Sequence, residues 1–190
     1  MFEKNSNQIF HITTATHDSR TSKRMRVYKI REKRDNGMHP RAQPIWLDAK
    51  GEELITSVVA NIVEEDNLDI IAYNICVDHM HLLLVCEEED VPKIMQKIKS
   101  ITAKIYNRSV GRTREPAPLS TSENDKKQHV SLWTQKFGCK KVTSRKQLYN
   151  TIRYIRNNRL KHKLPAHSIK TMSYIEKICT SDYKDFEITK

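Results

Sequence analysis

The chain has 190 residues, the size of one ordinary domain. Hydrophobic residues make up 37% of it and charged residues 30%, which allows a modest core. No stretch approaches the roughly 18 consecutive apolar residues that a membrane-spanning helix needs, and the N-terminus lacks the basic and then apolar order of a signal peptide. We therefore expect a cytoplasmic protein without a membrane partner.

Positive charge is the most informative feature of the composition. Lys and Arg number 34 against 23 Asp and Glu, which gives a net charge of +11. A field of this sign attracts polyanions, so nucleic acid is the expected partner. A solvated basic surface with no specific partner is the alternative that composition leaves open.

Hydrophobic periodicity and β-branched residues predict four strands and three helices. In chain order they are a strand at 8–16, a helix at 49–66, strands at 69–77 and 79–86, a helix at about 91–107, a strand at about 139–143 and a helix at about 145–161. The first six match the β-α-β-β-α-β order of a ferredoxin-like antiparallel sheet. We therefore expect an α+β fold with helices packed on that sheet and a further helix at its C-terminal end.

Two polar segments interrupt these elements. Residues 19–43 are rich in Arg and Lys and predict a mobile basic loop, and residues 111–129 are rich in turn-forming residues and predict a flexible loop. We expect one catalytic domain over residues 1–165 and a C-terminal tail at 166–190, with one short helix near Tyr174–Cys179.

Two histidines open the apolar strand 79–86. His79 and His81 are two positions apart, so both imidazoles project from one face of the strand. Two neighbouring imidazoles suit a divalent cation that takes one more ligand from elsewhere. Two strand-end histidines that only form hydrogen bonds are the alternative reading of the same spacing.

A tyrosine lies on one flank of the last predicted helix. Leu148, Ile152 and Ile155 form its apolar stripe, and Tyr154 lies roughly 110° from the centre of that stripe. Asn150, Asn158 and Lys161 share the flank of Tyr154, and Arg153, Arg156 and Lys161 form a basic group suited to phosphates. Beside a metal-binding histidine pair, a tyrosine hydroxyl can attack a phosphodiester. The alternatives are a core-edge tyrosine with its hydroxyl in water, or a nucleophile at Tyr106 or Tyr149, the latter predicted nearer the apolar stripe.

Three motifs, in this order, resemble one known family. They are Val77-Asp78-His79-Met80-His81-Leu82-Leu83-Leu84, Leu132-Trp133-Thr134-Gln135-Lys136-Phe137 and the segment from Tyr149 to Asn158. Together they resemble the single-tyrosine transposases with a His-hydrophobic-His ("HUH") strand, and within them the REP-associated tyrosine transposases. The resemblance covers residues 8–162. In one departure, Arg159 stands where the family usually has proline, which predicts a helix that continues a turn further.

The resemblance implies a set of residue roles. His79, His81 and Asn158 take the places of ligands to Mg²⁺ or Mn²⁺, and Tyr154 that of the nucleophile that forms a 5′-phosphotyrosine. The implied substrate is single-stranded DNA with hairpins, which predicts a nucleoid-associated protein, and the family allows both monomers and homodimers. The expected DNA contacts are Arg20, Lys23, Arg24, Arg26, Lys97, Lys104, Arg153, Arg156 and Lys161.

Two other functions stay open at this point. A ferredoxin-like sheet with this charge can bind nucleic acid without cutting it, although Tyr73 is the only aromatic residue on the strands at 69–77 and 79–86. A metal-dependent nuclease that uses water would leave no covalent product.

Overall fold

The structure is a computed structural model that describes residues 8–17, 19, 44–111 and 131–180. Within them it contains a four-stranded antiparallel sheet in the order β2-β3-β1-β4. The strands are β1 (Gln8–Ala15), β2 (Asp69–Cys76), β3 (His79–Cys86) and β4 (Gly138–Val142). The α+β fold and the predicted order of the first six elements are therefore confirmed.

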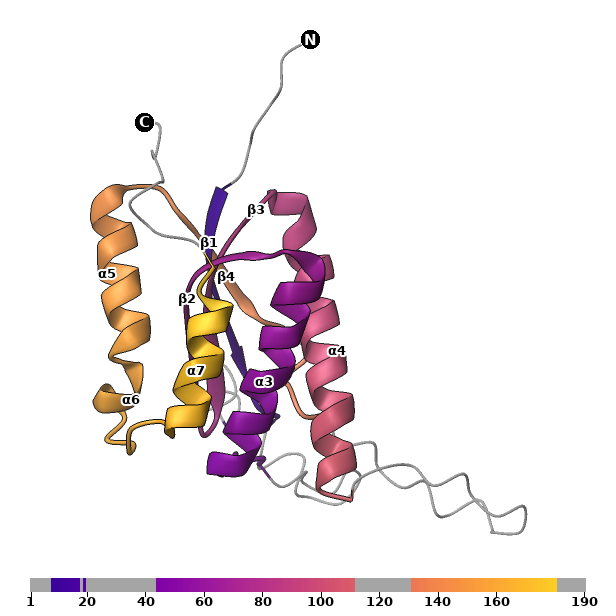
Figure 1. The fold of residues 1–190 in the computed structure, drawn as a ribbon. Helices are drawn as coiled ribbons and strands as arrows, with labels where there is room; N and C mark the ends of the chain where they lie inside the picture. Colours follow the sequence, from indigo (N-terminus) through magenta and orange to yellow (C-terminus); the bar gives the residue numbers. More distant parts are fainter. Residues whose placement is uncertain (1–7, 18, 20–43, 112–130, 181–190) are drawn as a thin grey trace, which may run out of the picture.

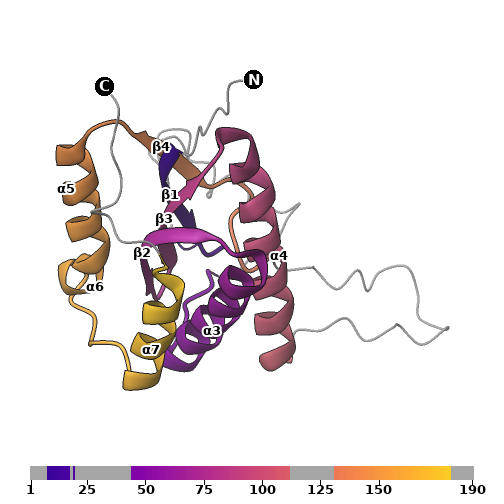
Figure 2. The ribbon, with the colours of Figure 1, turned by 45° about the horizontal axis from the view of Figure 1, so that its top comes forward.

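Helices cover both faces of the sheet (Figures 1 and 2). On one face lie α3 (Ala49–Asp66) and α4 (Val91–Ser109), the latter preceded by a short 3-10 turn at Glu88–Asp90. On the other lie α5 (Arg145–Arg156) and α6 (Asn158–Lys161). Because side chains alternate along a strand, each face has its own core: Met80 and Leu82 pack towards α3 and α4, and Leu83 and Val85 towards α5.

Capping residues explain where the helices begin and end. The Asp48 carboxylate accepts a hydrogen bond from the Gly51 N–H at the start of α3, and the Ser144 hydroxyl accepts one from the Gln147 N–H at the start of α5. Asn67 ends α3 in the left-handed conformation, with φ at 49°.

The last predicted helix is interrupted. We expected a single helix over 145–161, extended by the arginine at 159, but α5 ends at Arg156 and α6 starts at Asn158. At the break, the Asn74 side-chain amide donates to the Ile155 carbonyl at 2.6 Å. This contact satisfies one of the carbonyls that the end of α5 leaves without a helical donor.

The segment after residue 165 contains α7 (Ile169–Ile178), which packs on α3 and the β2 edge. Its last residue, Ile178, is fully buried in the core shared with α3 and α4. The expected short helix is thus present, though it begins earlier than predicted, and the domain limits at 1–165 and 166–190 stay a prediction. In the described part of the chain, no helix has the length and apolar character needed to cross a membrane.

Candidate active site

The two strand histidines lie side by side under α5. His79 and His81 are 1% and 3% exposed, and their ring centroids are 4.9 Å apart with nearly perpendicular planes. Both project from the face of β3 that carries Leu83 and Val85, as their spacing predicts. Both rings are thus buried beneath a helix and do not lie at a solvent-exposed end of the strand. They form the buried side of the candidate site.

His79 is held between an acid and an amide. Its Nδ1 contacts the Asp78 carboxylate, and its Nε2 lies 2.8 Å from Asn158 Oδ1. In a neutral ring, an Nδ1–H that donates to Asp78 leaves Nε2 with a lone pair. Two acceptor atoms then face each other across 2.8 Å, an arrangement that a cation between them, or a second proton on the ring, would stabilise.

His81 is oriented from the neighbouring strand. Its Nδ1 lies 2.9 Å from Thr13 Oγ1 and 3.1 Å from His11 Nε2. Burial, with the nearby Lys140 ammonium, lowers the pKa of His11, so this ring is neutral and its Nε2 can accept. A His81 Nδ1–H that donates to these groups directs Nε2 of the same ring into the site, as outer partners of ligating histidines commonly do.

Tyr154 lies against two histidine rings, those of His81 and His11. Its ring meets the His81 ring edge-on at 5.3 Å between centroids and the His11 ring at 6.0 Å. The Lys161 ammonium lies 5.1 Å from the centre of the Tyr154 ring. Tyr154 is 37% exposed, so one side of it rests on the histidines and the other is open to a ligand.

Asn158 begins α6 and is fully buried, although Tyr154, four positions earlier, is 37% exposed. Its Oδ1 faces His79 and also accepts from the Cys76 thiol at 3.3 Å. Its Nδ2 is buried and forms no hydrogen bond to any residue that the structure describes.

The donor set fits a small divalent cation. His79, His81 and Asn158 supply two imidazole nitrogens and an amide oxygen from two elements. Neighbouring ligands of an octahedral cation at about 2.1 Å are about 3 Å apart, close to the separation of His79 Nε2 and Asn158 Oδ1. No group of three His, Cys, Asp or Glu side chains suited to a metal occurs among the described residues, so a site here depends on the amide.

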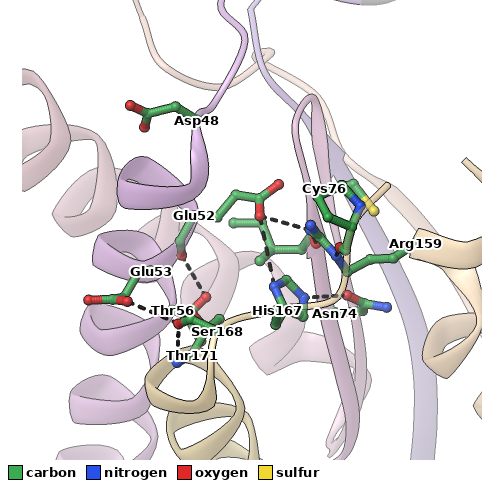
Figure 3. Close-up of polar contacts among 12 residues, drawn as sticks. Asp48, Glu52, Glu53, Thr56, Asn74, Cys76, Arg159, His167, Ser168 and Thr171 are labelled. Carbon is green, nitrogen blue, oxygen red and sulfur yellow. Dashed lines mark hydrogen bonds and ion pairs between the residues drawn. The ribbon is translucent and has the colours of Figure 1, made fainter. Parts of the chain in front are cut away.

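A buried ion pair holds α6 against the sheet edge (Figure 3). The Arg159 guanidinium donates to Glu52 Oε2 at 2.8 Å, to the Ile75 carbonyl at 3.0 Å and to the Pro165 carbonyl at 2.8 Å. Since Glu52 belongs to α3, this arginine bridges the two helical layers around strand β2. The residue next to Asn158 is thereby fixed from several directions.

His167 completes this network. Its Nε2 lies 3.1 Å from Asn74 Oδ1 and its Nδ1 is 3.8 Å from Glu52 Oε2. Burial, with a smaller contribution from the Arg159 charge, lowers the pKa of His167 to about 4, so the ring is neutral near pH 7. Burial raises the pKa of Glu52, and Arg159 opposes that shift.

Sequence comparison places the chain in a family. The model of the IS200-like transposases matches residues 40–158, which is more than half of the chain and includes His79, His81, Tyr154 and Asn158. The chain belongs to the IS200-like transposase family. The predicted relationship is therefore confirmed, and the residues described above form the candidate active site of a transposase.

The solved structures that resemble the chain share little of its sequence. A REP-associated tyrosine transposase bound to a REP hairpin is 13% identical, with 82% of this chain and 68% of that chain covered and a TM-score of 0.47. A candidate transposase from Deinococcus radiodurans is 17% identical, with 83% and 95% covered and a TM-score of 0.45. None of the curated proteins matches the chain.

The predicted DNA-contacting residues of this transposase fall into three groups. Lys161 of α6 lies over the Tyr154 ring, whereas Arg153 and Arg156 lie on α5, and Arg156, two positions after Tyr154, is on another side of that helix. Lys97 and Lys104 lie on α4, on the opposite face of the sheet, and Lys97 forms an ion pair with Asp66 at 2.6 Å. The structure therefore does not bring those two lysines to the site. The remaining four, Arg20, Lys23, Arg24 and Arg26, lie outside the described residues.

The two rival tyrosines lie at other positions in the fold. Tyr106 is buried at the end of α4, where its ring is so close that a Cβ on Gly51 would lie 2.9 Å from it. Tyr149 is 50% exposed on α5. The predicted place of Tyr149 nearer the apolar stripe does not bury it, since it is more exposed than Tyr154.

Sequence reasoning missed three groups around the pair. His11 and Thr13 reach His81 from β1, and the His162 ring lies 5.1 Å from the His79 ring. The alternation of β1 places His11 and Thr13 on one strand face, but only the pairing of Thr13 with His81 in the sheet shows that this face also carries the histidine pair. No sequence signal identifies His162.

Proposed function

We propose that the chain is a metal-dependent transposase that cleaves and rejoins single-stranded DNA through a covalent bond to Tyr154. The observation that carries this proposal is the placement of a partly exposed phenol against the buried ring of His81, next to His79, whose Nε2 faces the amide oxygen of Asn158. Nucleophile and ligand set thus belong to one site, as this chemistry needs.

His79, His81 and Asn158 would hold Mg²⁺ or Mn²⁺. When bound, such a cation supplies Lewis-acid polarisation of the scissile phosphate. Asp78 and the pair His11 and Thr13 would keep the two imidazoles in the tautomer that presents Nε2. A Cys76 thiol that donates to Asn158 Oδ1 helps to keep that oxygen turned towards His79.

The reaction conserves one phosphoester bond. The Tyr154 oxygen loses its proton to solvent and attacks the phosphorus, and the bond from phosphorus to the 3′ oxygen breaks. The products are a 5′-phosphotyrosine and a 3′ oxygen that takes up a proton to become a hydroxyl. Attack by another 3′ hydroxyl on the phosphotyrosine reverses these steps and joins a new strand, so no ATP is required.

The substrate is single-stranded DNA next to a hairpin, as the family resemblance implies. Lys161 lies over the Tyr154 ring, and Arg153 and Arg156 add positive charge elsewhere on α5, so these three residues can neutralise backbone phosphates. The net charge of +11 supports binding to a polyanion of this kind. Whether the protein acts as a monomer or as a homodimer stays a prediction.

A passive nucleic-acid-binding module is less consistent with the site. Modules that read RNA on an open sheet use exposed aromatic residues, whereas both faces of this sheet carry helices. Tyr73 is 3% exposed, and its hydroxyl lies 3.4 Å from Thr56 Oγ1 on α3. The sheet therefore offers no stacking platform among the described residues.

Covalent trapping tests the proposal. The protein is incubated with hairpin-bearing single-stranded DNA and Mn²⁺, and the products are separated on a denaturing gel. We expect a protein–DNA adduct that is absent without metal and absent in Tyr154→Phe. Tyr149→Phe is the matched control, since it removes a phenol of the same helix, and it should keep the adduct.

The other outcomes identify the alternatives. Cleavage that survives in Tyr154→Phe and leaves no adduct would contradict the proposal and indicate a nuclease that uses water. Binding without cleavage of any hairpin-bearing strand would indicate a passive binding module.

A further inference from the structure

A cavity of about 450 Å³ lies beside Tyr154 and His11. Residues of α5 form one wall, and His11 of β1 and Lys140 of β4 form the other. These two strand residues face each other in the sheet, so this wall is rigid. Since sites for small molecules typically measure about 300–1,000 Å³, the cavity has room for one nucleotide but not for a duplex.

The cavity runs along α5 from Tyr154 to Ser144. These residues are ten positions apart, about 15 Å at about 1.5 Å per residue. A DNA strand whose phosphate lies at the Tyr154 hydroxyl therefore has to place a neighbouring nucleotide either in this cavity or in open solvent.

The lining of the cavity contains positively charged side chains and the side-chain amide of Asn150. Lys140 and Lys146 are exposed at the cavity and suit a backbone phosphate. Gln147 is engaged locally, because its Oε1 accepts from the Thr143 N–H at 3.0 Å and its Nε2 donates to the Lys141 carbonyl at 3.4 Å. Asn150 is exposed, and the structure shows no hydrogen bond from its side chain to any described residue.

We propose that this cavity binds the nucleotide next to the scissile phosphate and that Asn150 distinguishes its base. The inference rests on the proposed function, because it takes Tyr154 as the residue that attacks the phosphate. An amide carries a donor and an acceptor side by side and forms paired hydrogen bonds with a base edge, which separates one base from another. Lys140 and Lys146 contact phosphate and add affinity that does not depend on sequence.

The test uses a pool of single-stranded DNA that carries a hairpin followed by randomised positions. The full-length protein is incubated with the pool and Mn²⁺, and two fractions are sequenced, the covalently attached DNA and the DNA bound without a covalent link. We expect the wild type to prefer one base by about tenfold or more at the position next to the cut. Asn150→Ala should remove that preference and leave preferences at other positions unchanged.

Two matched controls accompany these variants. Asn61→Ala replaces an exposed asparagine of α3, on the other side of the sheet, and should keep the full preference. Lys146→Ala should raise KM for all sequences alike without changing kcat or the base preference, and Lys177→Ala on α7 should change neither constant. Because Asn150 is exposed, its replacement should leave the melting temperature unchanged.

The failures are distinguishable. A base preference that persists in Asn150→Ala, or a wild type that cuts without any preference at this position, overturns the inference and leaves the proposed function intact. If no adduct forms with any sequence, the proposed function fails. The DNA bound without a covalent link then still decides the inference, since its base preference should depend on Asn150 in the same way.

Discussion

At the scale of single residues, the site depends on which atoms face each other. His79 Nε2 and Asn158 Oδ1 are both acceptors when His79 donates from Nδ1 to Asp78, and they are 2.8 Å apart and buried. Burying two facing acceptors is unfavourable unless a positive species lies between or beside them. A cation bound by these two atoms would therefore remove the cost of burying them face to face.

Asn158 should control metal affinity. Asn158→Leu keeps an apolar volume but removes the oxygen, so we expect Mn²⁺ affinity to fall about 100-fold or more, since loss of a mere outer partner costs about 10–100-fold. Asn158→Asp restores an oxygen ligand and should restore binding. Tyr154→Phe, which removes no ligand, should bind Mn²⁺ like the wild type. Titration calorimetry measures the Mn²⁺ affinity of the wild type and the three variants. An Asn158→Leu variant with unchanged Mn²⁺ affinity would refute the assignment of Asn158 as a metal ligand.

His11 and Thr13 should act as positioning residues for His81. Each offers a partner to His81 Nδ1, so His11→Ala alone should weaken Mn²⁺ binding modestly because Thr13 still holds the ring. The double variant with Thr13→Val should lose about 10–100-fold. His11→Gln, which keeps an acceptor, should recover part of the loss. If the double variant binds Mn²⁺ as tightly as the wild type, the two residues do not position His81.

At the scale of elements, the site is formed where α5 meets α6. Tyr154 on α5 is partly exposed, Asn158 at the start of α6 is buried, and the Asn74 amide donates to the Ile155 carbonyl at the junction. Arg159 then fixes α6 to α3 and to the β2 edge through Glu52 and the Ile75 carbonyl. Tyr154 and Asn158 thus belong to two consecutive short helices.

The Arg159–Glu52 pair should contribute strongly to stability when one partner is removed. Its side chains are only 11% and 4% exposed, so Arg159→Met leaves a buried carboxylate without its charge partner and should cost about 3–5 kcal/mol. The double variant Glu52→Leu with Arg159→Met removes both charges and should recover most of that loss. Urea unfolding measures both, and a loss below about 1 kcal/mol in Arg159→Met would contradict a supporting role for the pair.

Local sequence patterns predicted the helices and strands better than they predicted the contacts between them. The spacing of His79 and His81 was sufficient to place both rings on one face, because strand alternation is a local property. The relation of Tyr154 to Asn158 was inferred from a continuous helix, and the break invalidates that geometry although both residues still reach the site. The contact at the break comes from Asn74, 81 residues before Ile155, which no local pattern reveals. His11 was missed for the same kind of reason, since it joins the site through strand pairing.

At the scale of the whole molecule, the sheet separates two layers with different tasks. The layer of α3, α4 and α7 holds the larger core, and the layer of α5 and α6 covers the histidine face. The network of Glu52, Arg159, His167 and Asn74 joins the two layers around the β2 edge. Global stability and the geometry of the site are therefore linked through this edge.

His167 should make that stability depend on pH. Its pKa is lowered to about 4 in the folded chain, against about 6.5 when unfolded. The unfolded chain therefore binds the proton more readily between these values, so the free energy of unfolding is highest above about pH 6.5 and falls as the pH drops towards 4. The loss due to this group should approach about 3 kcal/mol at pH 4.

Chemical unfolding of the wild type and His167→Gln between pH 4 and 7.5 measures this effect. The difference between the two curves isolates His167 from Glu52, whose raised pKa acts in the opposite direction by favouring the folded state as the pH falls. Parallel curves for the two proteins would show that His167 is not buried as a neutral ring.

The most direct measurement of the central claim is the location of the DNA–protein bond. After trapping with hairpin-bearing single-stranded DNA and Mn²⁺, nuclease and trypsin digestion should leave nucleotide phosphate on one tyrosine peptide. Cleavage after Lys and Arg separates Tyr154, Tyr149 and Tyr106 into three different peptides, so mass spectrometry can assign the bond. We predict the modification on the Tyr154 peptide alone. A modification on the Tyr149 or Tyr106 peptide, or none in a sample that has cleaved its DNA, would contradict the account.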